Sequence, residues 1–198
     1  MDKYAVTMDG NVPEPAEIAR LLGEADFGPM PRAADRDAWA AIAARPWVSE
    51  RMPRLLEHAR RAAQSDPLPV KATDYLSFFR TGLRDAHNAS AGRRSAMLSV
   101  LTVAECLEHE GRFLDALLDV SWAIAEETSW IMPPHLMSEG GRQLPDVADP
   151  RIDLRVATLG KLLGQMVYLL GPEMDAISPM WRRRINFEVR RQVIDPYL

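Results

Sequence analysis

The spacing of apolar residues is helical along nearly the whole chain. Apolar positions recur at intervals of three and four residues, and no β-branched run alternates apolar and polar residues between hairpin turns. The pattern therefore predicts an all-α protein. The expected helices cover residues 13–25, 35–46, 49–63, a segment from about residue 74, and residues 93–110, 113–127, 153–171 and 178–194.

Capping and helix-breaking residues set the expected helix ends. Ser, Thr and Asp accept hydrogen bonds from the first turn, Gly adopts the left-handed C-cap conformation, and Pro does not continue a helix. The expected N-caps are Ser49, Thr73 or Asp74, and Asp153. The expected stops are Pro46, Gly111, the pair Gly171-Pro172, and Pro196.

The clearest break lies in SDPLPVKATDY, residues 65–75, where Pro67 and Pro69 impose extended backbone. It divides the chain into an N-terminal helical arm, residues 1–66, and a main body, residues 67–198. In the main body, helices 93–110 and 113–127 are so close that they predict an antiparallel hairpin. Successive antiparallel pairs are typical of a bundle, a helical solenoid or an (α/α) toroid, and no short fixed-period repeat favours the solenoid.

Composition and charge narrow the class of protein. The 198 residues are 47% hydrophobic and 26% charged, as in ordinary globular proteins, and the net charge of -4 argues against a dedicated nucleic-acid binder. The single cysteine, Cys106, excludes an internal disulfide framework and is expected to be a small core residue. The sequence shows neither a signal peptide nor a membrane-spanning run, so a cytoplasmic protein is expected.

Motifs for common catalytic chemistry are missing from the sequence. The four histidines stand far apart and form neither an HxxxH nor an HExxH pair, so no metal site is expected. The sequence contains no glycine-rich phosphate loop and no G-x-S-x-G elbow. We therefore assign no catalytic residue and expect no cofactor.

The helix 113–127 combines two stripes of different character. One side carries the apolar residues Phe113, Leu117, Val120 and Ile124, which predict a core face. The opposite side carries Asp115, Asp119, Trp122 and Glu126. A flat ring beside carboxylates suits recognition of a neutral sugar, whereas a solvated face with one half-covered tryptophan is the alternative interpretation.

The last helix is basic and carries one acid, Glu188. Its arginines are Arg182, Arg183, Arg184, Arg190 and Arg191, and its apolar seam is Trp181, Ile185 and Val189. Glu188 is spaced to form an ion-pair ladder with Arg184 and Arg191. The alternative is a face that binds a carboxylated or sulfated polymer, or a nucleic acid, through guanidinium groups.

The segment EETSWIMPPHL, residues 126–136, follows the two-striped helix. The prolines at 133 and 134 prevent a helix there and stiffen the backbone, which presents Trp130 and His135. Periodicity places Glu126 on the acidic stripe and Glu127 nearer the core. Trp130 and His135 therefore either form the wall of a binding site, or close the helix end and bond a backbone carbonyl.

From about Tyr75 to the end, the chain resembles the (α/α)-toroid region of heparinase II/III-like proteins. The most specific pieces are EGRFLD at 110–115, EETSW at 126–130 with the following PPH, and IDL at 152–154. The resemblance implies a polysaccharide lyase, which cleaves uronic-acid-containing glycans by β-elimination. Combined with the acidic stripe, it gives the expected substrate-binding residues Trp130, His135, Glu126, Trp122 and Asp119.

The chain departs from the family pattern at its end. The resemblance places the catalytic Asn- or His-bearing segment and a β-sandwich after PYL, which is residues 196–198 here. We therefore expect the scaffold and one cleft wall of a lyase, inactive alone, with an acidic polysaccharide as partner and without nucleic-acid or membrane partners. Apolar helix faces left uncovered would favour self-association. The alternative is a non-catalytic helical module that binds other proteins.

Overall fold

The computed structural model describes residue 20, residues 30–136 and residues 143–198. The expected helix 13–25 lies almost entirely outside these residues. Pro31–Leu198 forms one compact unit, and its described residues are helices and connections without a strand. The elements are α2 (Arg36–Ala43), α3 (Pro46–Ser49), α4 (Met52–Ala63), α5 (Ala72–Thr81), α6 (Asp85–His87), η1 (Asn88–Gly92), α7 (Arg93–Glu108), α8 (Leu114–Ala125), η2 (Pro133–Leu136), α9 (Leu154–Ile177), α10 (Pro179–Val189) and η3 (Arg190–Ile194).

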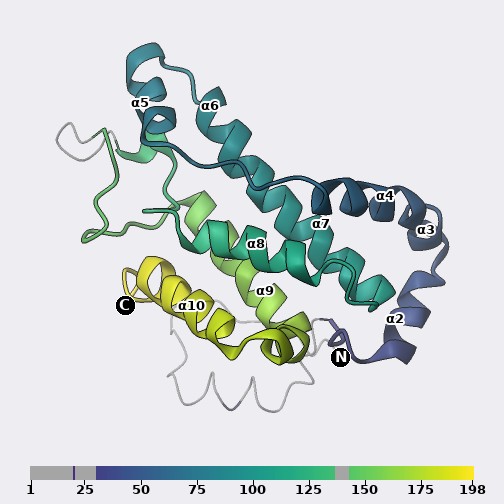
Figure 1. Cartoon of the computed structure of the whole chain (residues 1–198). Coiled ribbons are helices and arrows are strands. Elements are labelled where there is room, and N and C mark those ends of the chain that lie inside the picture. The colour runs from purple at the N-terminus through teal and green to yellow at the C-terminus, as the bar shows by residue number, and fades with distance from the viewer. Residues whose placement is uncertain (1–19, 21–29, 137–142) are drawn as a thin grey trace, which may run out of the picture. The chain divides into compact units, whose positions relative to one another are not determined.

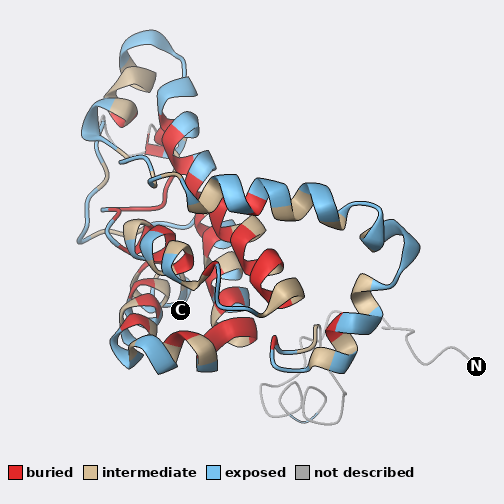
Figure 2. Ribbon diagram, turned by 45° about the vertical axis from the view of Figure 1, so that its right-hand side comes forward, coloured by how far each residue is buried: buried red, intermediate tan, exposed pale blue. Residues whose placement is uncertain are grey.

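Two helical hairpins form the centre of this unit. A short connection joins α7 to α8, as the sequence predicts, and Ser178 alone separates α9 from α10. The helices α8 and α10 lie side by side, and α7 and α9 pack against them (Figure 1). The hairpins therefore share one core, which holds most of the buried residues (Figure 2).

The helix α8 presents its apolar stripe to this core. Phe113, Leu117, Val120 and Ile124 are all fully buried, which confirms the stripe predicted from their spacing. Facing residues from the second hairpin include Leu159, Leu163, Met166, Leu170, Trp181 and Ile185, each fully or almost fully buried. Removing this apolar area from water is the main favourable term holding the hairpins together.

The helices α2, α3 and α4 belong to the same compact unit. The extended segment at residues 66–71, which contains Pro67 and Pro69, separates α4 from α5 as its prolines predict. The helix α4 nevertheless packs along α7, and α2 contacts α7 near its end. Arg36 in α2 donates to the carbonyls of Cys106 and Leu107 at 2.7 and 2.8 Å, which satisfies acceptors exposed at the end of α7.

Several predicted helix ends are wrong. Pro46 occupies the first turn of α3 rather than stopping a helix, because an N-terminal position needs no N–H donor. Ser49 lies inside α3, and the N-cap of α5 is Lys71. Asp74 instead accepts the Lys71 N–H at 3.0 Å, and so supports the start of α5 from inside the helix.

The end of α7 also differs from the prediction. The left-handed C-cap is His109, with φ 55°, and Gly111 at φ 74° follows in the connection. The buried Glu105 carboxylate accepts the N–H groups of Gly111 and Phe113 at 2.7 and 2.9 Å. A side chain of α7 thus fixes the tight turn into α8, where the sequence suggested glycine alone.

The helix α9 does not stop at Gly171-Pro172 but continues through Pro172 to Ile177. Proline donates no hydrogen bond and its ring displaces the preceding carbonyls, so two acceptors in α9 need other partners. The Tyr168 carbonyl accepts from the Arg32 guanidinium, and the Leu169 carbonyl accepts from the Ala33 N–H, both at 3.0 Å. The Arg32 guanidinium also lies 4.6 Å from the centre of the Tyr168 ring.

Other ends agree with the sequence. Asp153 caps α9 by accepting the Val156 N–H at 2.8 Å, and the final helical segment ends at Ile194, before Pro196. Cys106 is fully buried, and burial raises the pKa of its thiol to about 12. It is therefore a core residue, as expected. None of the described helices combines the length and the apolar character that a membrane crossing requires.

Candidate functional site

Residues 126–136, which we call the turn, follow α8. The turn begins with two glutamates that point to different sides. Glu126 is exposed, whereas Glu127 is buried, which confirms the difference predicted from periodicity. After this point the chain carries no helical hydrogen-bond ladder until the 3-10 turn η2. Side chains from distant helices therefore have to hold the backbone of the turn.

Glu127 lies between two arginines in the protein interior. Its carboxylate oxygens lie 3.1 Å from Arg94 Nη1 and 2.7 Å from Arg155 Nη2, and its side chain is only 2% exposed. Arg94 comes from α7 and Arg155 from α9, so one carboxylate links three parts of the chain. Such a buried cluster depends on all of its members, because each charge left alone would be costly.

The same two arginines also bond backbone carbonyls. Arg94 donates to the carbonyls of Leu68 and Ala123, both at 2.6 Å, and Arg155 donates to the carbonyl of Trp130 at 2.9 Å. These acceptors lie in the extended segment before α5, at the end of α8 and in the turn. The two arginines thus fix the position of the turn and also compensate the negative charge of Glu127.

Trp130 is fully buried beneath the turn. Its indole N–H donates to the Ile124 carbonyl at 2.9 Å, and its backbone N–H donates to Gln192 Oε1 at 2.9 Å. The ring therefore closes the end of α8, which is the structural role that the sequence left open. A wholly buried ring offers no face to a sugar.

Glu188 forms a second buried cluster on α10. Arg184 and Arg191 lie 3.1 and 2.7 Å from its carboxylate, which confirms the ion-pair ladder predicted from the spacing. Gln192 also donates to Glu188, at 3.0 Å, and so connects this cluster to Trp130. Arg184 also donates to the Ala125 carbonyl at 2.7 Å, and Arg191 donates to the Val147 carbonyl at 3.2 Å, so both arginines of the ladder have structural partners.

Tyr75 of α5 supports the turn, and His87 of α6 packs against Tyr75. The Tyr75 hydroxyl donates to the Ser129 carbonyl at 2.8 Å, and its ring meets the His87 ring edge-on at 4.8 Å. Burial raises the pKa of the Tyr75 phenol well above its usual range. His87 is fully buried, and burial, with a smaller contribution from the Arg155 charge, lowers its pKa to about 4.

His135 lies at the far end of the turn, beside the start of α9. Its Nδ1 lies 2.6 Å from Asp153 Oδ2, and the same oxygen accepts the Met132 N–H at 2.7 Å. Asp153 also caps α9, so one carboxylate orients the imidazole, holds the turn and starts the helix. The His135 side chain is 45% exposed.

An open cleft of about 680 Å³ lies at this end of the turn, and we refer to it as the His135 cleft. Its polar lining brings an imidazole, a guanidinium and a carboxylate together beside apolar side chains. The lining residues are Ile131, His135, Arg151, Ile152, Asp153, Leu154 and Ala157. Arg151 and Asp149, which are 49% and 44% exposed, form an ion pair of 3.0 Å at its edge.

A second open cleft of about 520 Å³, the Glu126 cleft, lies between the end of α8 and α10. Glu126 and Glu127 line it from the first helix and its following turn, and Arg184, Phe187 and Glu188 line it from the second. Its carboxylates outnumber its arginines. This lining does not favour an anionic ligand.

The acidic side of α8 is exposed, as its periodicity predicts. We refer to Asp115, Asp119, Trp122 and Glu126 as the α8 stripe. The Trp122 indole N–H donates to Glu126 Oε1 at 3.0 Å, and the Trp122 residue is 43% exposed. The tryptophan and the glutamate thus form one connected pair on the surface.

The expected substrate-binding residues are therefore not gathered in one place. His135 lines the His135 cleft, Glu126 lines the Glu126 cleft, and Trp130 lies inside the protein. Asp119 and Trp122 stand on the outer surface of α8.

Sequence reasoning missed Arg151 and Arg155, although both stand close to the Ile152-Asp-Leu154 motif. The available signal was that one arginine precedes and another follows Asp153, the N-cap residue of α9. Among the described residues, no group of three or more His, Cys, Asp or Glu side chains could hold a metal ion.

Comparison of the chain with protein-family models finds no match, and a search of characterised proteins finds none either. The resemblance of residues 75–198 to heparinase II/III-like proteins thus rests on the sequence motifs alone.

Proposed function

We propose that this chain is the helical scaffold and glycan-binding wall of a heparinase II/III-like polysaccharide lyase, with its helix pairs forming part of an (α/α) toroid. The observation that carries the proposal is the His135 cleft. Its imidazole, guanidinium and apolar side chains lie beside the turn that resembles the family motif. The substrate class that follows is a glycan containing uronic acid.

The polar groups of the cleft suit a uronate. A guanidinium can bond both oxygens of a carboxylate, and Arg151 stands at the cleft edge. Its pairing with Asp149 is half exposed, and an exposed pair of this kind is worth only about 0–1 kcal/mol. A substrate carboxylate would compete with Asp149 for the Arg151 guanidinium.

The remaining lining suits the body of a sugar. Asp153 holds the ring of His135 in one orientation, so this imidazole is prepared to meet a hydroxyl or carboxylate. Ile152 and Leu154 are 39% and 80% exposed, and offer apolar contact to the C–H face of a pyranose. The cleft thus combines orientation with a surface for packing, as small-ligand sites do.

The proposed contribution is binding, not proton transfer. β-Elimination requires a base for the C5 proton and stabilisation of the enediolate-like species that follows. We assign neither task to a described residue of this chain. A lyase assay on alginate and heparin, read by absorbance of the unsaturated product, is therefore expected to give no product with this chain alone.

Isothermal titration with alginate and heparin oligosaccharides tests the binding proposal. Arg151→Ala is expected to weaken binding at least about tenfold, and Arg151→Lys less, because it keeps the charge but loses the planar fork. A neutral oligosaccharide of equal length should bind weakly to all variants. Arg61→Ala, on the exposed side of α4, is the matched control.

Two outcomes would overturn the binding proposal. One is that wild-type protein binds neither uronate oligosaccharide. The other is that binding persists unchanged in Arg151→Ala and in His135→Ala while both variants keep their far-UV circular dichroism spectra.

A further inference from the structure

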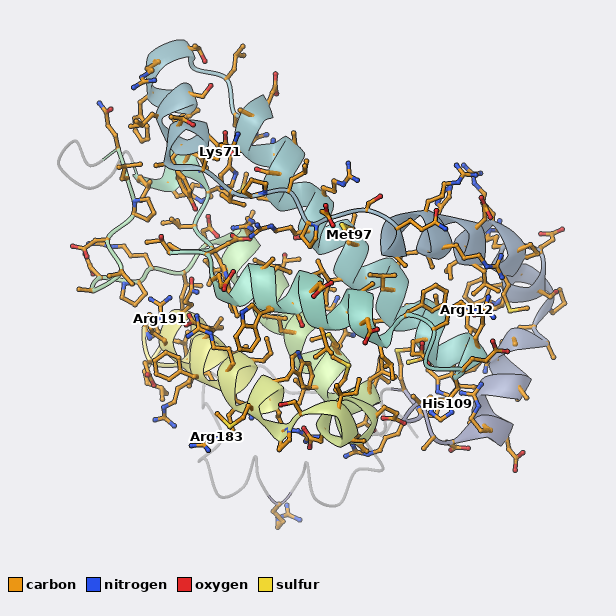
Figure 3. All side chains as sticks on the ribbon, viewed as in Figure 1. Lys71, Met97, His109, Arg112, Arg183 and Arg191 are labelled. Carbon is orange, nitrogen blue, oxygen red and sulfur yellow. The ribbon has the colours of Figure 1, made fainter. Side chains whose placement is uncertain are left out.

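The helix α10 exposes a stripe that the core does not use. Met180 and Phe187 are each 57% exposed, and Arg183 and Arg190, the first residue of η3, lie on the same side. We refer to these four residues as the α10 stripe. It faces away from the buried Trp181, and Figure 3 shows Arg183 extending away from the ribbon. An apolar surface interrupted by cations is typical of an interface rather than of a solvated face.

The local partners of these cations leave the stripe accessible. Arg183 contacts the Met180 sulfur at 3.8 Å, within the stripe itself. Arg190 pairs with Asp195 at 3.1 Å, with side chains 71% and 52% exposed. Exposed pairs of this kind are weak and exchange readily. The α10 stripe therefore presents positive charge and apolar area together.

The neighbouring helix carries the complementary surface. The α8 stripe contains three carboxylates, from Asp115, Asp119 and Glu126, around the exposed ring of Trp122. Both stripes point away from the core, because each lies opposite the buried side of its own helix. The molecule thus displays an acidic-aromatic stripe next to a basic-apolar one.

The two helices run in the same direction. The Trp181 indole N–H donates to Ser121 Oγ at 2.8 Å, and further along both helices Arg184 donates to the Ala125 carbonyl at 2.7 Å. Figure 1 shows the two helices side by side in this parallel arrangement. These contacts also fix their register, with residue 121 level with residue 181.

We infer that the partner of the α10 stripe is the α8 stripe of a second copy of this chain. A two-fold axis parallel to the helices places α8 of each copy over α10 of the other. Because the contact is reciprocal, one encounter forms it twice and closes a dimer. This interface would give the chain the protein-binding role that the sequence leaves open.

The register supports the pairing of charges. A rotation about this axis does not change the height of any residue along the helices. Each residue of α8 is therefore at the same height relative to the partner's α10 as it is relative to the α10 of its own copy. Glu126 of one copy then falls between Arg183 and Arg190 of the other, about 4.5 Å and about 6 Å along the axis from them at 1.5 Å per residue. Trp122 falls between Met180 and Phe187. Long arginine side chains span these offsets.

The alternative pairings are electrostatically poorer. Packing α10 on α10 would bring the four arginines of two stripes together, and packing α8 on α8 would do the same with six carboxylates. Like charges facing each other across an interface are unfavourable. The His135 cleft takes no part in the proposed contact, so this inference does not depend on glycan binding.

Sedimentation velocity with charge-reversed variants tests the dimer. Arg183→Glu with Arg190→Glu makes both stripes acidic, and Asp119→Lys with Glu126→Lys makes both basic. Each double variant alone is expected to weaken dimerisation at least about tenfold. An equimolar mixture of the two should restore a dimer, because every α8–α10 contact then joins opposite charges.

The control is Arg54→Glu with Arg61→Glu on α4, which carries the same change of charge outside the stripes and should dimerise as the wild type does. Phe187→Ala, which leaves the charges intact, should also weaken the dimer. A wild-type chain that stays monomeric at its highest soluble concentration would overturn the inference. So would a mixture that fails to associate, or an Asp119→Lys, Glu126→Lys variant that dimerises normally.

Discussion

Replacing Glu127 by glutamine removes the negative charge between Arg94 and Arg155 while keeping the size of the side chain. The carboxylate is 2% exposed, and the two guanidinium groups that face it are 8% and 10% exposed. The amide can still accept one hydrogen bond, but it cannot neutralise either arginine. The variant therefore tests whether the charge or merely the shape at this position holds the turn.

The expected loss follows from the burial of the partners. Removing one member of a buried ion pair destabilises a protein by about 3–5 kcal/mol, because the other charge stays in a medium of low dielectric. Here two cations remain, and each keeps carbonyl partners that offset part of the penalty. We expect Glu127→Gln to lower the free energy of unfolding by about 3 kcal/mol, or the melting temperature by ~6–12 °C.

Urea unfolding followed by far-UV circular dichroism measures this loss, and Glu126→Gln is the matched control. The two glutamates are adjacent in sequence, but Glu126 is exposed and should change stability by less than about 0.5 kcal/mol. Equal losses in the two variants would refute the reasoning. So would a Glu127→Gln variant within about 0.5 kcal/mol of the wild type.

Three further predictions follow from burial and backbone geometry. Burial lowers the pKa of His87 to about 4, so as the pH drops the unfolded chain binds the proton before the folded chain does. The free energy of unfolding should therefore fall as the pH drops from about 6.5 toward 4. Urea titrations of His87→Leu should show a weaker pH dependence. Burial raises the pKa of Cys106 to about 12, so a maleimide should label it only after unfolding, as mass spectrometry would show. Gly164→Ala should stabilise α9 by about 0.5–1 kcal/mol in thermal melts, since a Cβ there meets nothing within 4 Å.

Each of these predictions has a control or a contradicting result. His58→Gln should keep the pH dependence of the wild type, because residue 58 is exposed. Rapid labelling of Cys106 in native protein would contradict its burial. Gly160→Ala should gain less than Gly164→Ala, since its Cβ would lie 3.0 Å from Val193 Cγ2, and an equal gain would show that this contact relaxes freely.

Local patterns predicted the helical class and the faces of the central helices. The buried stripe of α8, the Asp153 cap and the Glu188 ladder all depend on residues a few positions apart, where helical geometry fixes the spacing. The difference between Glu126 and Glu127 followed from the same periodicity. These features needed no knowledge of how the helices pack.

Non-local contacts decided the rest. The partners of Glu127 lie 33 and 28 residues away, so no spacing rule indicates them. Trp130 belongs to the family-like turn, but its burial depends on Gln192 and on the end of α8. The sequence therefore indicated that the turn resembles a family motif, but it did not show which side chains of the turn face solvent.

The hydrogen bonds that carry α9 past Pro172 come from residues near the start of the compact unit. Arg32 reaches the Tyr168 carbonyl across 136 residues of sequence, and Ala33 bonds the next carbonyl. Contacts between such distant residues require closure of a large loop and are slow to form. Residues 31–36 are synthesised long before α9, so these two hydrogen bonds can form only after α9 has been made, and we expect them to be a late step in folding.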